Sequence, residues 1–303
     1  MLELLAQSPA ALVAVALIVG LVVGSFLNVV IYRLPIMLER QWQAESAAAA
    51  NAPDGEPSSS AAADQRPFNL VLPRSRCPAC QAPISAIHNI PVLSYLALRG
   101  RCARCRVRIS ARYPAVELLS GVATALVAWR FGFGWAAACA MVVTWFLIAL
   151  TFIDLDVQLL PDSLTLPLLW LGLVASLTGW SSSATSLPSD PVSAIGGAAI
   201  GYLSLWALYH LFRLLTGKEG MGHGDFKLLA ALGAWLGWQM LLPIVLLSAG
   251  VGAIIGVALI AMRRQQRGNP IPFGPFLAAA GWVSMLWGPQ MVARYLGLFA
   301  PYR

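Results

Sequence analysis

Eight long apolar stretches are the feature that most constrains how this chain folds. They cover residues 9–32, 114–129, 135–153, 164–180, 193–215, 226–238, 241–262 and 273–297. A helix needs about 20 apolar residues to cross a bilayer, and only helices or closed barrels satisfy their backbone there. Of the 303 residues, 58% are hydrophobic and 11% charged, unlike a soluble domain. The sequence predicts an all-α polytopic membrane protein with about eight transmembrane helices, of which the sixth is short enough for a half-span.

The basic residues predict the orientation of these helices. Residues 1–32 contain no Lys or Arg, and the apolar run continues through residues 24–28 without an Ala-x-Ala site there, so we expect this segment to remain as a transmembrane helix and not to be removed as a secretory signal. Eight alternating helices bring 17 of the 20 Lys and Arg residues to one side. By the positive-inside rule that side is the cytoplasm, and both termini are periplasmic. The net charge of +7 then reflects topology and anionic lipid, and it is no indication of nucleic-acid binding.

The polar segment 33–113 is predicted to be a cytoplasmic domain between the first two helices. Residues 45–65 are rich in Ala, Ser and Pro, so we interpret them as a flexible linker. Two C-x2-C pairs follow within residues 77–105, with 21 residues between them: Cys77 with Cys80 and Cys102 with Cys105. Matched pairs of this kind hold a structural zinc ion in zinc ribbons. The alternatives are a redox pair or disulfides, and a reducing cytoplasm disfavours disulfides.

Three other candidate ligands are interpreted as structural side chains. His88 lies between the cysteine pairs, but four thiolates already complete a tetrahedral site. His210 lies in an apolar stretch and is expected to be packed there. Cys139 stands alone in an apolar stretch, where a small buried thiol is common.

Two acidic motifs at the ends of apolar stretches form the candidate catalytic site. Asp154 follows an unbroken apolar run, and Asp225 follows alternating glycines at 220, 222 and 224. A carboxylate at membrane depth is costly unless it faces protein or water, so its default interpretation is functional. The two residues lie 71 positions apart, which leaves room for two intervening helices. We therefore expect both carboxylates near the same, cytoplasmic, face.

The polar residues around this pair are assigned simpler roles. Asp156 is the alternative to Asp154 as the catalytic carboxylate, but Asp154 follows the apolar run directly and Asp156 is expected to be solvated at the membrane interface. Asp162 or Ser163, after a proline, is expected to cap the next helix. Lys227 is expected either to steady Asp225 or to contact lipid headgroups.

Paired carboxylates can hydrolyse a peptide bond. They share one proton, so one activates water while the other polarises the scissile carbonyl. The glycines before Asp225 leave room for an extended peptide; a phosphate-binding loop is the alternative, but no strand precedes it. The chain has no G-x-S-x-G or H-E-x-x-H motif, and its three histidines are scattered. The sequence thus predicts an aspartyl protease with Asp154 and Asp225 as its catalytic pair.

These motifs, in this order, resemble those of the bacterial type IV prepilin peptidases, which are bifunctional leader peptidases and N-methyltransferases of the GxGD aspartyl protease class. The resemblance covers nearly the whole chain. It rests on the segments at 24–30, 33–35, 89–91, 112–117 and 270–275, on the two cysteine pairs, and on the motifs of Asp154 and Asp225. It implies that the chain cleaves the basic leaders of type IV prepilins and of type II secretion pseudopilins at the inner membrane.

The resemblance also implies a second activity, which the residue patterns alone do not indicate. It is methylation of the new N-terminal residue with S-adenosylmethionine as the methyl donor. The family associates this step with the cysteine-bearing segment, where Gly100 precedes the third cysteine. Gly100 is therefore the candidate residue for methyl transfer.

A membrane transporter is the alternative from a different functional class. In that interpretation, the intramembrane carboxylates relay protons and the zinc module is a docking domain. Transporters often contain internal repeats, and no repeat is visible in this sequence. We therefore favour three regions: a first transmembrane helix at 1–32, a cytoplasmic domain at 33–113, and a transmembrane protease core at 114–303.

Overall fold

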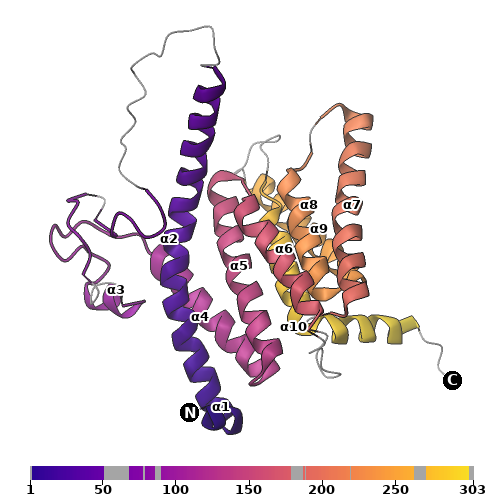
Figure 1. Cartoon of the computed structure of the whole chain (residues 1–303), viewed down its shortest axis with the longest axis horizontal. Helices are drawn as coiled ribbons and strands as arrows, with labels where there is room; N and C mark the ends of the chain where they lie inside the picture. The colour runs from indigo at the N-terminus through magenta and orange to yellow at the C-terminus, as the bar shows by residue number, and fades with distance from the viewer. Residues whose placement is uncertain are drawn as a thin grey trace. The chain divides into compact units, whose positions relative to one another are not determined.

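The computed structural model of the chain describes residues 2–50, 68–77, 79–85, 90–178, 187, 189–218, 220–262 and 271–299. Helices dominate these residues (Figure 1). They are α1 (Leu2–Gln7), α2 (Pro9–Ala50), α3 (Leu93–Ala97), α4 (Arg112–Phe131), α5 (Trp135–Val157), α6 (Asp162–Ser176), α7 (Pro191–Thr216), α8 (His223–Leu236), the 3-10 helix η2 (Trp238–Met240), α9 (Leu241–Ala261) and α10 (Gly274–Phe299). The only β-type pairings among the described residues are two isolated bridges.

Each of the eight apolar stretches corresponds to one helix, so the predicted all-α membrane fold is confirmed. Within the described residues, five helical segments are long and apolar enough to cross a membrane: α2, α4, α5, α7, and η2 together with α9. The helices α6 and α8 have 15 and 14 residues. At 1.5 Å per residue, α8 is about 21 Å long, which is shorter than a bilayer core of about 30 Å. This agrees with the short sixth segment expected from the sequence.

The first long helix extends beyond residue 32, the end of the predicted first transmembrane helix. α2 has 42 residues and continues to Ala50, through the first part of the segment interpreted as a linker at 45–65. Glutamine and glutamate side chains pair along its exposed end, where Gln41 Nε2 donates to Glu45 Oε1 at 2.9 Å. Such pairs and an alanine run support a helix. Residues 51–65 and His88 lie outside the described residues.

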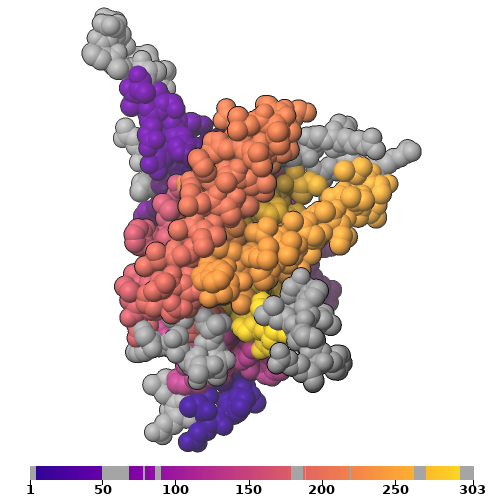
Figure 2. All heavy atoms as spheres, turned by 90° about the vertical axis from the view of Figure 1, so that its right-hand side faces the viewer, coloured from indigo at the N-terminus to yellow at the C-terminus, as the bar shows by residue number. Residues whose placement is uncertain are grey.

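The chain divides into two compact units. One combines Met1–Leu17 with Val122–Arg303 and is called the helical unit below. Its helices α5 to α10 pack as a bundle (Figure 1), with α8 against α6, α7 and α10. α8 is the buried centre, since every residue from Leu228 to Leu236 is buried. Figure 2 shows a face of this bundle that contains α7 and α9. Both helices expose large apolar side chains, such as Leu214 and Leu242, as lipid-facing helices require.

The second unit, Ile18–Gly121, is called the cysteine unit below. It contains most of α2, the cysteine segment, α3 and the start of α4. Asn28 Nδ2 on α2 donates to the carbonyl of Tyr113 at 3.0 Å, which connects α2 to the start of α4. Arg33 is buried and donates to the carbonyls of Asn69 and Pro73, so it fixes the returning chain on α2.

Candidate active site and metal centre

Asp154 lies in the last turn of α5, at the end of the apolar run. The helix stops at Val157 because Gln158 takes a left-handed conformation and Pro161 follows soon after. The Asp154 side chain is 5% exposed. Its carboxylate accepts a hydrogen bond from the backbone N–H of Gly274, the first residue of α10. A carboxylate at a helix N-terminus is electrostatically favourable, so α10 holds Asp154 in place.

Asp225 lies in the first turn of α8, where its charge is also favoured by the helix N-terminus. The side chain is 6% exposed. It accepts a hydrogen bond from the backbone N–H of Gly222, the residue that caps this helix. This arrangement corresponds to half of a capping box. Asp225 Oδ1 is buried and has no hydrogen-bond partner among the described residues, which is unusual for a buried polar atom.

The two carboxylates belong to one site within the helical unit. The charge of Asp154 acts electrostatically on Asp225. Leu160 lies close to Gly224, which precedes Asp225, and to Gly274, which bonds Asp154: its Cβ would be 2.6 Å from a Cβ at Gly224, and its Cδ1 3.2 Å from a Cβ at Gly274. Only glycine leaves these approaches free. In the part of the chain that the structure describes, neither carboxylate forms an ion pair. Two adjacent, buried carboxylates without a cation can hold a shared proton.

The packing of α7 against α8 sets the position of Asp225. Glycines meet at the crossing, because a Cβ at Gly197 would lie 2.3 Å from the Gly233 carbonyl oxygen. At the start of α8, the fully buried Phe226 packs on two α7 rings, with centroids 5.7 Å away at Tyr209 and 6.0 Å at Tyr202. Asp225 therefore sits next to a residue that is fixed by close contacts.

The structure separates Asp154 from the other acidic candidates. Asp156 is exposed, as expected. Asp162 does not cap a helix: it is the first residue of α6, whose cap, Pro161, makes no side-chain hydrogen bond. Asp162 instead binds Lys227, with Nζ 2.6 Å from Oδ1. The expectation that Lys227 steadies Asp225 or contacts lipid headgroups is therefore corrected, because its ammonium pairs with Asp162.

The four paired cysteines of the cysteine unit converge. The Sγ atoms of Cys77, Cys80, Cys102 and Cys105 all lie within 4.8 Å of one another. Each pair sits in a hairpin closed by an isolated bridge, Arg76 with Pro83 and Arg101 with Arg108. In both hairpins the first cysteine's N–H donates to the carbonyl five positions later at 2.9 Å. The two hairpins thus repeat one backbone design.

This geometry fits a tetrahedral metal site. Zn–S bonds of about 2.3 Å place tetrahedral sulfurs about 3.8 Å apart, and Cys77 Sγ lies 3.8 Å from Cys105 Sγ. Hydrogen bonds from the backbone N–H groups of Cys105 and Arg104 lower the pKa of the Cys102 thiol to about 6. The N–H groups of Cys80 and Ala79 lower the pKa of Cys77 as well. Thiolates at neutral pH are the form that binds zinc. The cluster can hold a metal ion.

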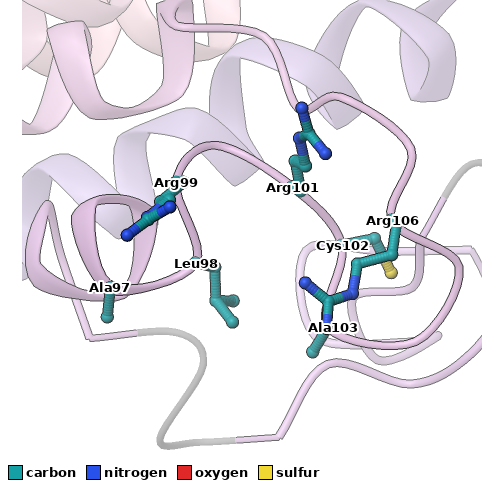
Figure 3. Close-up of a pocket in the computed structure, with 7 residues that line it drawn as sticks. All are labelled: Ala97, Leu98, Arg99, Arg101, Cys102, Ala103 and Arg106. Atoms are coloured by element: carbon teal, nitrogen blue, oxygen red, sulfur yellow. The ribbon is translucent and has the colours of Figure 1, made fainter.

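Gly100 lies beside a cavity of about 520 Å³. The lining residues belong to the end of α3 and the second hairpin: Ala97, Leu98, Arg99, Arg101, Cys102, Ala103 and Arg106. Figure 3 shows Arg106 reaching from the hairpin toward Leu98, whereas Arg101 points away from them. Gly100 has a φ of +66°, and a Cβ there would lie 2.8 Å from the Tyr95 hydroxyl. Both features require glycine at this position.

The remaining candidates are structural where they are described. His210 contacts the rings of Trp206 and Tyr209, at centroid distances of 4.3 and 5.3 Å. Cys139 is buried in α5. Both agree with the packed side chains expected from the sequence.

The apolar helices and the family matches define a membrane-embedded protein of the aspartic peptidase class. Residues 18–131 match the bacterial peptidase A24 N-terminal domain, and residues 141–257 match the type IV leader peptidase family. The chain belongs to the type IV leader peptidase family, which confirms the resemblance and the prediction that it is an enzyme.

Curated relatives match almost the full length. The chain is 53% identical to the prepilin leader peptidase/N-methyltransferase of Stutzerimonas stutzeri, over 97% of both proteins. It is 54% identical to that of Aeromonas hydrophila over 99% of both. With that of Pseudomonas aeruginosa the identity is 51%, over 98% of this chain and 97% of the relative. No solved structure matches the chain. None of these matches supports the transporter alternative.

Proposed function

We propose that this protein removes the leader peptide of prepilins and then methylates the new N-terminus. The observation that carries the proposal is the buried pair of Asp154 and Asp225 in a chain more than half identical to proteins named prepilin leader peptidase/N-methyltransferase. Pseudopilins of type II secretion are further candidate substrates, because the family resemblance extends to them.

Asp154 and Asp225 are the proposed catalytic residues. One carboxylate accepts a proton from the attacking water, while the other, protonated, donates a hydrogen bond to the scissile carbonyl. The tetrahedral intermediate collapses when the carboxyl that took the proton of the water passes it to the leaving nitrogen, so that the C–N bond breaks and the carboxylate is restored. The backbone N–H groups of Gly274 and Gly222 orient the two carboxylates throughout. Buried Asp225 Oδ1, which accepts no hydrogen bond from the described residues, is available for the shared proton.

The cysteine unit is the proposed site of metal binding and methyl transfer. Cys77, Cys80, Cys102 and Cys105 hold one structural Zn²⁺, which ties the two hairpins together. When bound, S-adenosylmethionine supplies an electrophilic methyl group to the amine that cleavage creates. The cavity beside Gly100 has a volume typical of small-molecule sites, and its arginines can bind the carboxylate of that donor.

The proposed orientation places the protease site where a prepilin presents its leader. The chain is a multi-pass membrane protein, and we infer an inner-membrane location with residues 33–113 in the cytoplasm and both termini in the periplasm. The basic residues support this orientation through the positive-inside rule. Residues 114–303 form the proposed transmembrane protease core, surrounded by membrane lipid.

One assay tests both activities. Purified protein is incubated with a prepilin and with S-adenosylmethionine labelled on its methyl group. We expect a shortened pilin that carries the label at its N-terminus. A pilin that keeps its full length, with the protein intact and zinc-loaded, would contradict the proposal.

A further inference from the structure

Glu117 connects three segments of the cysteine unit. It lies in α4, and its carboxylate accepts a hydrogen bond from the backbone N–H of Val92 at 2.8 Å. The hydroxyl of Ser25 on α2 donates to the same carboxylate. α2 and α4 are in direct contact here, since a Cβ at Gly24 would lie 2.7 Å from the Glu117 Cα. Glu117 thus fixes Val92 on a tightly packed helix pair.

Val92 is strained in a way that needs this support. Its φ is +59° and its ψ is −47°, a positive-φ conformation that lies outside the αL region and that β-branched residues avoid. Such a conformation is strained and persists only where surrounding contacts impose it. Among the described residues, Glu117 is the only one whose side chain accepts a hydrogen bond from the Val92 N–H. The hydrogen bond to the Glu117 carboxylate offsets this strain.

Val92 also determines where the methyl-transfer segment begins. It is the N-cap of α3, and α3 carries Tyr95. Tyr95 accepts the N–H of Gly100 at its carbonyl, 2.8 Å away, and its hydroxyl donates to the Ile109 carbonyl at 3.4 Å. The end of α3 lines the cavity beside Gly100. A displaced Val92 would therefore shift the cavity wall.

We propose that Glu117 is a positioning residue for methyl transfer, acting through Val92 and α3 on the cavity beside Gly100. The proposal rests on the function proposed above, in that the cavity is taken as the methyl-donor site. Glu117 does not touch the reacting groups; it holds the turn that places them. The carboxylates of the protease site belong to the other unit, so cleavage does not depend on Glu117.

The experiment compares Glu117→Ala and Glu117→Gln with the wild type. Glutamine keeps an oxygen that can accept the Val92 N–H, whereas alanine removes it. Methylation of a supplied mature pilin should fall roughly tenfold or more in the alanine variant, and stay within about threefold of wild type in the glutamine variant. Prepilin cleavage and zinc content should remain unchanged in both. Glu45→Ala, at an exposed acid on the same unit, is the matched control.

A second variant tests the route through Val92. Glycine adopts a φ of +59° without strain, so Val92→Gly in the Glu117→Ala background should recover at least part of the lost methylation. Wild-type-like methylation by Glu117→Ala would overturn the proposal, as would equal losses of cleavage and methylation or no recovery with Val92→Gly. Wild-type protein that cleaves prepilin but never methylates it would instead overturn the proposed function. The wild-type methylation assay is therefore carried out first.

Discussion

The backbone N–H of Gly274 donates to the carboxylate of Asp154, so the first residue of α10 holds the last turn of α5. A side chain at position 274 would displace the Asp154 carboxylate. A Cβ at position 274 would lie 2.6 Å from Asp154 Oδ2, well inside contact distance. This close contact explains why the 270–275 motif has a glycine at position 274.

Gly274→Ala should reduce prepilin cleavage by roughly 10- to 100-fold, because a misplaced catalytic group loses that much activity. Gly250→Ala on α9 is the matched control, since nothing lies within 4 Å of a Cβ there. The measurement is the initial rate of leader removal. Equal rates for the two variants would show that Gly274 does not constrain Asp154.

Gly197→Ala should disturb the crossing of α7 and α8 and thereby move Asp225. The new Cβ meets the Gly233 carbonyl at 2.3 Å, whereas at the neighbouring Gly196 the nearest atom is 4.0 Å away. Overpacking of this kind costs about 1–3 kcal/mol. We expect lower thermal stability and slower cleavage for Gly197→Ala but not for Gly196→Ala. If both variants behave like the wild type, the glycine contact does not position α8.

Each cysteine-to-serine change in the four-cysteine site should lower the zinc content from about one ion per chain and loosen the cysteine unit. Cys139→Ser is the control, because that cysteine lies in α5. Metal analysis and limited proteolysis measure the two effects. Wild-type protein that is reduced, free of metal and yet protease-resistant between residues 77 and 105 would rule out a structural zinc ion.

Gly100→Ala should impair methylation and spare cleavage. The alanine must adopt a φ of +66° and avoid the Tyr95 ring, so the wall of the cavity shifts. The rate of methylation of a supplied mature pilin measures this effect, because that substrate needs no prior cleavage. A variant that cleaves poorly but methylates normally would contradict the proposed division of the two activities.

The sequence was sufficient to locate the helices, because each apolar stretch is long and bounded by polar residues. It also singled out Asp154 and Asp225 as candidates, since carboxylates within apolar segments stand out from their surroundings, and the structure buries both side chains. The paired cysteines were equally visible from their spacing, and the structure brings their sulfur atoms together.

The contacts around these residues depend on tertiary packing and could not be predicted. Nothing in the sequence indicates that Lys227 pairs with Asp162, or that Glu117 bonds Val92. These partners are distant along the chain, and their encounter follows from how the helices cross. The extension of α2 to Ala50 did have a local signal, because the alanine run favours a helix.

Replacing the aspartates, alone and together, is the most direct test of the central claim. Asp154→Asn and Asp225→Asn should each reduce prepilin cleavage by at least roughly 10²-fold, and the double variant should be no worse, because members of one catalytic unit are not additive. Asp225→Asn should still methylate a supplied mature pilin. Substantial cleavage by either single variant, in folded and zinc-loaded protein, would contradict a shared catalytic site of Asp154 and Asp225.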